Sequence, residues 1–232
     1  MLPRVDLPEV LLEVFSWTGA DRAFTSVTGG DPRLRDLHVT IAALLVAHGC
    51  NVGYTPVLGG ADALKYGRLS HVDQTYLRLA TYRAANAALI AHQASIPLAQ
   101  AWGGGLVASV NGMRFVVPVP SVYARPNPRY FGASTRGGGR RSGATWLNMI
   151  NDQAAGLGGK VVAGTPRDSL YVLDVLYVLF DRDGGRRPEM IVTDTASYPD
   201  TVFGVLTLAE RVSGNPSLEL PDEDASTLVL SL

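Results

Sequence analysis

Three consecutive glycines, Gly103–Gly105, separate two parts of the chain whose apolar residues repeat with different periods. Before the glycines, apolar side chains recur at three- and four-residue steps, which is the spacing of a helix with one buried face. After them, short runs of β-prone residues alternate with turn-forming residues. We therefore expect an α+β or α/β protein with a helical N-terminal region and a sheet-forming second part.

Composition limits the class of protein. The chain has 232 residues, 47% of them hydrophobic and 18% charged, which is typical of a globular protein rather than a disordered one. The net charge of −1 excludes a polycation, so any nucleic-acid surface must be a local patch. No apolar run approaches the roughly 18 residues of a membrane helix. The single cysteine, Cys50, lies in an apolar run and is expected to be buried.

Three helices are predicted in the first part of the chain. One runs from the N-cap Asp6 to a stop at Gly19, and a second begins at Asp36. The third is the longest, because Ser70 and Asp73 resemble a capping box at its start and helical spacing continues unbroken to the next proline.

The second part is predicted to begin with a β-hairpin. Asn111-Gly112 joins two β-prone runs, residues 106–110 and 113–119, and Asn-Gly is the strongest short hairpin signal. Further elements are expected as strands at 145–150 and 160–165, a helix at 167–180, a strand at 186–194 and a helix at 200–212. The resulting order of strand, strand, strand, helix, strand, helix is the opening order of the RNase H-like fold.

That order singles out Asp194 as a candidate catalytic residue. Polynucleotidyl transferases of this fold place one Asp on the first strand, another at the end of the fourth, and a third acid on a later helix. The acids hold two divalent metal ions, and oxygen ligands suit Mg²⁺ or Mn²⁺. Asp194 ends an apolar strand, where the second acid belongs. The alternative is a turn-capping Asp that bonds to the backbone of Ala196.

The first acid should lie in the strand region around Asn111. An Asn side chain has nearly the shape of Asp and turns the same hairpin, but it lacks the negative charge on which a two-metal site depends. The two interpretations of Asn111, as a turn residue and as a metal ligand without its charge, are therefore compatible.

A segment rich in Pro, Gly and Arg, residues 120–143, follows the predicted hairpin. Its arginines could neutralise phosphates and its aromatic residues could stack on bases, as a DNA-facing loop requires. The alternative is a solvated loop with no partner. The candidate DNA-binding residues are Arg125, Arg129, Tyr130, Arg136, Arg140 and Arg141.

Taken together, these stretches resemble the DDE catalytic region of the Tn-three family of replicative transposases. The resemblance extends from the start of the chain to about Leu206. It rests on "LPRVDLPEVLLEV", "RLSHVDQTYLRLAT", "ANAALIAHQASIPLAQAWGGGLVASVNGMRFVVPV", "PNPRYFG", "TWLNMINDQAAGLGGKVVAGTPRDSLYVLD" and "RRPEMIVTDTASYPDTVFG". It implies an RNase H-like mixed β-sheet core with flanking helices, preceded by a helical region. It also implies DNA binding, transposon-end cleavage and strand transfer with Mg²⁺, with Asp194 as the second catalytic Asp.

Three departures from the family pattern shape the functional expectation. Asn111 stands where the family has its first catalytic Asp, and the family's catalytic Glu lies further downstream than this chain reaches. After about Leu206 the sequence no longer resembles the family. We therefore expect a helical region at 1–102, a partial RNase H-like core at 103–212, and an aberrant or disordered tail at 213–232.

The sequence thus predicts a fragment of a DDE transposase that is catalytically inactive as it stands. The alternatives are a non-catalytic module that binds DNA or a transposase, and the decayed product of a pseudogene. The expected partners are DNA, namely terminal inverted repeats and target, and either further copies of the chain or a full-length transposase. A cytoplasmic, nucleoid-associated location without membrane contact follows from these expectations.

Overall fold

The computed structural model of the chain describes residues 4–29, 34–117, 121–126, 142–164, 168–171, 174–175, 188, 190–194 and 227–231. The chain divides into two compact units, Met1–His92 and Gln93–Leu232. The division lies before the glycines at which the sequence changes period. Two hydrogen bonds connect the residues between the division and the glycines to the second unit: Gln93 donates to the carbonyl of Gln153, and the Gln153 side chain donates to the carbonyl of Gly103, at 2.9 Å.

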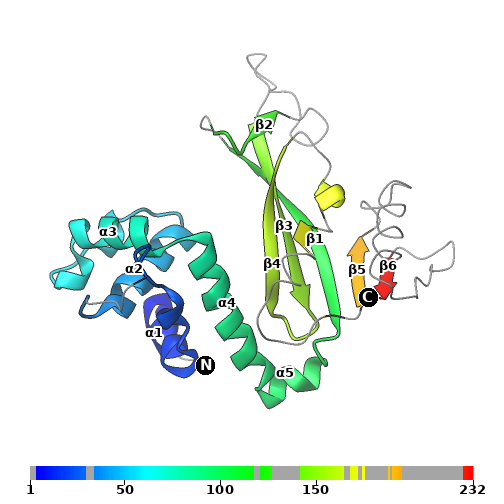
Figure 1. The fold of residues 1–232 in the computed structure, drawn as a ribbon, viewed down its shortest axis with the longest axis horizontal. Helices are drawn as coiled ribbons and strands as arrows, with labels where there is room; N and C mark the ends of the chain where they lie inside the picture. Colours follow the sequence, from blue (N-terminus) through cyan, green and yellow to red (C-terminus); the bar gives the residue numbers. More distant parts are fainter. Residues whose placement is uncertain are drawn as a thin grey trace. The chain divides into compact units, whose positions relative to one another are not determined.

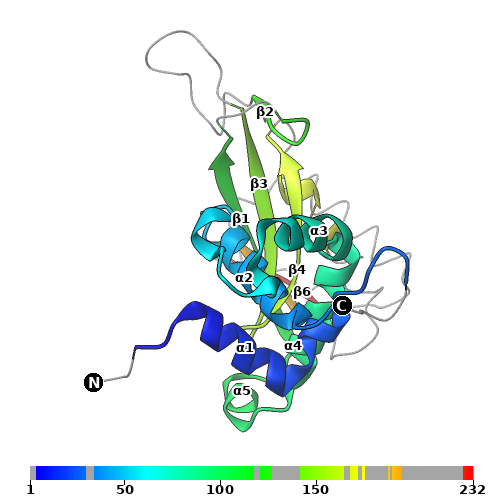
Figure 2. The same cartoon turned by 90° about the vertical axis from the view of Figure 1, so that its left-hand side faces the viewer.

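The first unit is helical, and α2 is its centre. Its helices are α1 (Leu7–Thr18), α2 (Leu37–Gly49), α3 (Tyr66–Tyr76) and most of α4 (Leu79–Ala94), joined by the short turns η1 (Ala20–Ala23), η2 (Thr55–Val57) and η3 (Asp62–Leu64). Figure 1 and Figure 2 show α2 between α1 and α3. Ile41 and Leu44 of α2 are fully buried, and Thr40 beside them donates a hydrogen bond to the carbonyl of Ala63.

The first two helix predictions are confirmed. α1 follows Asp6 and ends at Gly19, whose φ of +65° suits a residue without a Cβ atom. α2 follows Asp36. The expectation that Cys50 is buried is wrong, because the helix ends just before it and the thiol is exposed.

The third helix prediction is wrong in one respect, because the chain breaks it into α3 and α4. Leu77 is extended, and Thr81 holds the break: its hydroxyl accepts a hydrogen bond from the backbone N–H of Arg78 at 3.0 Å and donates to the carbonyl of Tyr76 at 2.7 Å. The proposed capping box is wrong as well. α3 begins at Tyr66, so Ser70 and Asp73 lie inside it.

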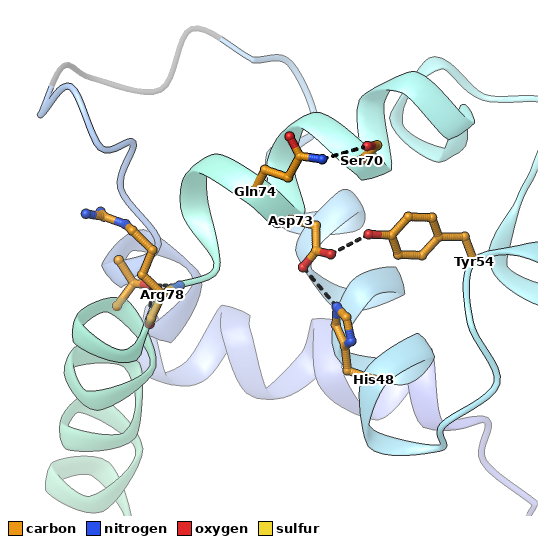
Figure 3. Close-up of polar contacts among 7 residues, drawn as sticks. His48, Tyr54, Ser70, Asp73, Gln74 and Arg78 are labelled. Carbon is orange, nitrogen blue, oxygen red and sulfur yellow. Dashed lines mark hydrogen bonds and ion pairs between the residues drawn. The ribbon is translucent and has the colours of Figure 1, made fainter. Parts of the chain in front are cut away.

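Asp73 instead joins three segments of the first unit. Figure 3 shows its carboxylate between His48 of α2 and Tyr54 of the following loop. His48 Nε2 lies 2.9 Å from one carboxylate oxygen, and the Tyr54 hydroxyl donates to the other. The Tyr54 ring also meets the edge of Tyr66 at a centroid distance of 5.8 Å. This cluster ties α2, α3 and the loop together by polar contacts beside the apolar core.

The second unit is built on a mixed sheet. Its strands are β1 (Val107–Val116), β2 (Arg125–Pro126), β3 (Ser142–Asn151), β4 (Gly156–Ala163), β5 (Met190–Asp194) and β6 (Thr227–Ser231), preceded by α5 (Pro97–Trp102) and with η4 (Asp168–Tyr171) after β4. The strand order is β2-β3-β1-β5-β6, and β4 also pairs with β3. β1 is antiparallel to β3 and parallel to β5, while β5 is antiparallel to β6. This is the RNase H-like arrangement, so the predicted fold class is confirmed.

The predicted hairpin at Asn111-Gly112 is wrong. β1 runs straight through both residues and pairs with β3 from Ala108–Asn151 to Val116–Gly143. A hairpin would have paired only the few residues on each side of the turn with each other. The long partner strand β3 satisfies the backbone groups of both halves of β1 at once, and this outweighs the local turn preference.

The strands predicted at 145–150, 160–165 and 186–194 are present as β3, β4 and β5. β6 lies in the segment expected to be an aberrant tail and pairs with β5 from Asp194–Thr227 to Met190–Ser231. The helix predicted at 200–212 and most of the one at 167–180 lie outside the described residues. In the described part of the chain, no helix is long and apolar enough to cross a membrane.

Leu44→Ala tests the position of the core of the first unit. Leu44 is fully buried in α2, so its truncation should lower the free energy of unfolding by about 2–5 kcal/mol. The matched control is Val10→Ala on the exposed side of α1, which should change it by less than about 0.5 kcal/mol. Urea unfolding followed by circular dichroism measures both, and equal effects would contradict the assignment of α2 as the core helix.

Tyr54→Phe tests the Asp73 cluster. The hydrogen bond to the Asp73 carboxylate raises the pKa of the Tyr54 phenol from 10.0 to about 12. The unfolded chain therefore loses this proton at lower pH than the folded chain, so the contribution of Tyr54 to stability is complete below pH 10 and is lost as the pH rises toward 12. Removing the hydroxyl should cost roughly 1–3 kcal/mol at pH 7 and should flatten the decline in stability between pH 10 and 12.

Urea unfolding at stepped pH measures this effect. Tyr123→Phe is the control, since Tyr123 is exposed in the other unit and its replacement should leave the wild-type pH profile in place. If the free energies of unfolding of Tyr54→Phe and of the wild type decline in parallel above pH 10, Asp73 does not hold the phenol proton.

Candidate active site

Asn111 and Asp194 lie on neighbouring parallel strands, β1 and β5. The register pairs Val107 with Met190 and ends with Val110 opposite Thr193. Asn111 and Asp194 are the next residues on the two strands. Adjacent strands are about 5 Å apart, so the fold brings these two backbone positions side by side. The juxtaposition expected from the RNase H-like order is therefore present.

The two faces of the sheet differ in burial. Ala108 and Val110 of β1 are buried, and so are Leu147 and Met149 of β3, which lie on the same side. Asn111 belongs to the alternate residues of β1, which are exposed. One face of the sheet is thus covered by the core of the second unit, and the other is open to solvent and includes Asn111.

The Asn111 side chain already has a hydrogen-bond partner. The backbone N–H of Gly112 donates to Asn111 Oδ1 at 2.7 Å. Across β1 from β5, the register places Asn148 of β3 directly opposite Asn111. A carboxylate at position 111 could accept the same hydrogen bond, because an Asp oxygen occupies nearly the same place as the amide oxygen.

These residues do not fit a two-metal centre. Such a centre requires several carboxylates to balance two divalent cations, whereas Asn111 offers a neutral oxygen. Among the described side chains, no group of three or more His, Cys, Asp or Glu residues is placed to hold a metal ion. The backbone positions 111 and 194 are therefore adjacent, and position 111 offers a neutral oxygen.

Of the candidate DNA-binding residues, the structure describes only Arg125. It is exposed on β2 and pairs with Gly143 at the end of β3. Arg129, Tyr130, Arg136, Arg140 and Arg141 lie outside the described residues. The residues that flank them, Pro126 and Ser142, pair with each other in the sheet.

Sequence reasoning missed the other residues on the open face of the sheet. Trp146, Asn148 and Ile150 of β3 share this face with Asn111. Residues 144–151 carry apolar side chains on both sides of the strand, so their pattern does not mark the open face. The incorrect hairpin also hid the pairing, since a turn at Asn111 would have placed that residue away from β3.

Comparison with known proteins identifies the family. The family model described as the Tn3 transposase DDE domain matches residues 9–211. The transposase for transposon Tn4556 of Streptomyces fradiae is 82% identical over 223 residues, which are 96% of this chain and 24% of that protein. The transposase for transposon gamma-delta of Escherichia coli K12 is 44% identical over 90% of this chain and 20% of its own length. The transposase for transposon Tn501 of Pseudomonas aeruginosa is 33% identical over the same shares.

The chain spans between a fifth and a quarter of the length of these curated relatives. Because the Tn4556 alignment covers 96% of the chain, it extends beyond Leu206 and into the segment 213–232 that the sequence analysis set apart. The strand order, the adjacency of positions 111 and 194, and the extent of the sequence matches all agree with the matched family. The chain belongs to the Tn3 transposase DDE domain family.

Proposed function

We propose that this chain acts in DNA transposition as the DDE-domain part of a transposase, and that in its present form it does not catalyse phosphoryl transfer. One observation carries the second statement: Asn111 follows the last register pair of β1 with β5, next to Asp194. At this place the family has its first catalytic Asp. The reactions that we associate with this domain are transposon-end cleavage and strand transfer. This chain lacks the negative charge at position 111 that they require.

The loss of a single charge is large on the scale of metal binding. A carboxylate about 4 Å from a cation contributes roughly 1–4 kcal/mol per unit charge in the dielectric range of a protein surface, and a divalent ion doubles this. The hydrogen bond from Gly112 also occupies the amide oxygen that remains. Both effects weaken Mg²⁺ or Mn²⁺ binding between positions 111 and 194.

DNA is the proposed partner, in the form of transposon terminal inverted repeats and of target DNA. The support is the family membership together with the arginines between Pro126 and Ser142. A chain that binds DNA without cleaving it would compete with, or associate with, a full-length transposase. We place this activity in the bacterial cytoplasm, where the chromosome lies.

Asn111→Asp should create a metal site that the wild-type chain lacks. We expect isothermal calorimetry with MnCl₂ to give little heat for the wild type and binding at least about tenfold tighter for Asn111→Asp, because one carboxylate is restored beside Asp194. Peptide mapping should confirm Asn at position 111 in the wild-type sample beforehand, since Asn-Gly pairs are prone to deamidation.

Asn148→Asp is the matched control. It adds the same charge on the same face of the sheet, but on β3, which is one strand further from Asp194. This control should bind Mn²⁺ no better than the wild type. Equal binding by the wild type and Asn111→Asp, or Mn²⁺-dependent cleavage of transposon-end DNA by the wild type, would refute the proposed inactivity.

A further inference from the structure

The Asn111 side chain folds back onto the backbone of the residue that follows it. The backbone N–H of Gly112 donates to Asn111 Oδ1 at 2.7 Å. A carbonyl carbon lies about 1.2 Å from its oxygen, so Cγ of Asn111 is within about 4 Å of the Gly112 nitrogen. A bond between these two atoms closes a five-membered ring, and Asn-Gly pairs lose their side-chain amide through that ring. The hydrogen bond thus holds the two reacting groups next to each other.

The Gly112 N–H points to the edge of β1 at which pairing with β5 has ended. Along an antiparallel pair, hydrogen-bonded and non-bonded residue pairs alternate. The N–H of Val117 donates to the carbonyl of Ser142, which makes these two residues a bonded pair. Counted back along the register, Gly112 belongs to a non-bonded pair, so its N–H points away from β3. On the other edge, β1 pairs with β5 only as far as Val110. The acceptor that the N–H finds there is the Asn111 side chain.

Exposure and the neighbouring glycine favour the same reaction. Asn111 is exposed on the open face of the sheet, so water reaches its side chain. Gly112 has no Cβ atom to obstruct the approach of its nitrogen to Cγ. Among the Asn residues of the sequence, only Asn111 precedes a glycine. Asn148, on the same face, precedes the fully buried Met149. Sequence and structure therefore single out one Asn for loss of its amide, and it is the one next to position 194.

We propose that Asn111 is a deamidation site, and that its conversion to Asp supplies the carboxylate that the chain lacks at position 111. This inference rests on the proposed function, because it names how the site beside Asp194 gains its missing charge. The chain is made without that charge and acquires it with time. The rate is set by the chain's own backbone at Gly112 rather than by a second enzyme.

The reaction balances with water as the co-reactant. Hydroxide removes the proton of the Gly112 N–H, and the nitrogen attacks Cγ of Asn111. The N–Cγ bond forms and the Cγ–Nδ2 bond breaks, so Nδ2 takes up a proton and leaves as ammonia. Water then adds to Cγ of the cyclic imide, the N–Cγ bond breaks, and the Gly112 N–H is restored. One Asn and one water thus give one Asp and one ammonia, with no change of oxidation state.

The sheet determines which product the folded chain retains. Opening of the ring at Cγ gives Asp and leaves the backbone as it was. Opening at the backbone carbonyl gives isoaspartate, whose chain runs through the side-chain carbons and is longer by one methylene group. β1 is paired with β3 on both sides of position 111, from Ala108–Asn151 to Val116–Gly143. A longer backbone breaks this register, so Asp is the product that is compatible with the fold.

A time course by mass spectrometry tests the modification itself. Fresh wild-type protein is incubated in mildly alkaline buffer at physiological temperature and then digested with trypsin. Arg83 and Arg114 are successive cleavage sites, so one peptide contains both Asn111 and an internal reference, Asn86, which precedes an alanine. We expect position 111 to gain one mass unit progressively while Asn86 stays unchanged. Electron-transfer fragmentation distinguishes Asp from isoaspartate, and the Asp share should be larger in the folded chain than in urea.

Gly112→Ala is the matched variant, because it keeps Asn111 but places a methyl group beside the attacking nitrogen. Gly112 lies in a strand, a conformation that alanine also adopts, and circular dichroism checks that the variant is folded. The added methyl group restricts the backbone, so the mass gain at position 111 should be slower by roughly tenfold or more. An unchanged rate would show that the amide is not lost through the Gly112 nitrogen.

Calorimetry with MnCl₂ connects the modification to the candidate site. Aged wild-type protein should bind Mn²⁺ with the affinity of Asn111→Asp. Its stoichiometry, relative to Asn111→Asp, should equal the fraction of Asp that mass spectrometry finds at position 111. Gly112→Ala aged for the same time should give no more heat than fresh wild-type protein.

The outcomes separate this inference from the proposed function. If Asn111 gains mass no faster than Asn86, or gives mainly isoaspartate in the folded chain, the inference fails and the proposed function is unaffected. The inference also fails if aged protein that contains Asp binds no more Mn²⁺ than fresh protein although Asn111→Asp binds it. If neither aged protein nor Asn111→Asp binds Mn²⁺ better than fresh protein, position 111 is not a missing ligand and both fail.

Discussion

The pairing of β1 on both of its edges is the constraint on which the second unit depends. On one edge β1 is antiparallel to β3 along nearly its whole length, and on the other it is parallel to β5. Its alternate residues Ala108 and Val110 are buried, so a shift of one residue would turn the apolar side chains to solvent. Burial of one face therefore fixes the register, and the register fixes which residues become neighbours of Asp194.

This constraint explains why the residue at position 111 can differ without loss of the fold. Asn111 lies on the open face, where its amide accepts a hydrogen bond from Gly112 and contributes nothing to the core. A substitution that removes a charge from the open face leaves the strand order, the register and the core in place.

Local signals in the sequence determined the first two helices, the three later strands and the fold class. Gly19 ends α1 in the left-handed conformation that a residue without a Cβ atom adopts readily, and this effect needs no distant partner. Asp6 and Asp36 directly precede α1 and α2, although neither side chain makes a capping hydrogen bond. The adjacency of positions 111 and 194 was also predictable, because strand order alone makes β1 and β5 neighbours. These structural predictions are confirmed because each depends on residues close in sequence or on topology.

Only the tertiary structure decided the rest. Asn111-Gly112 favours a turn by itself, but β3 offers both halves of β1 a longer partner, and that strand lies some thirty residues away. Asp73 resembles a cap in sequence, yet its carboxylate binds His48 and Tyr54, which are distant along the chain. Asn148 lies opposite Asn111 only through cross-strand pairing. Local preferences are worth about 1 kcal/mol each, so long-range pairing and burial prevail wherever the two disagree.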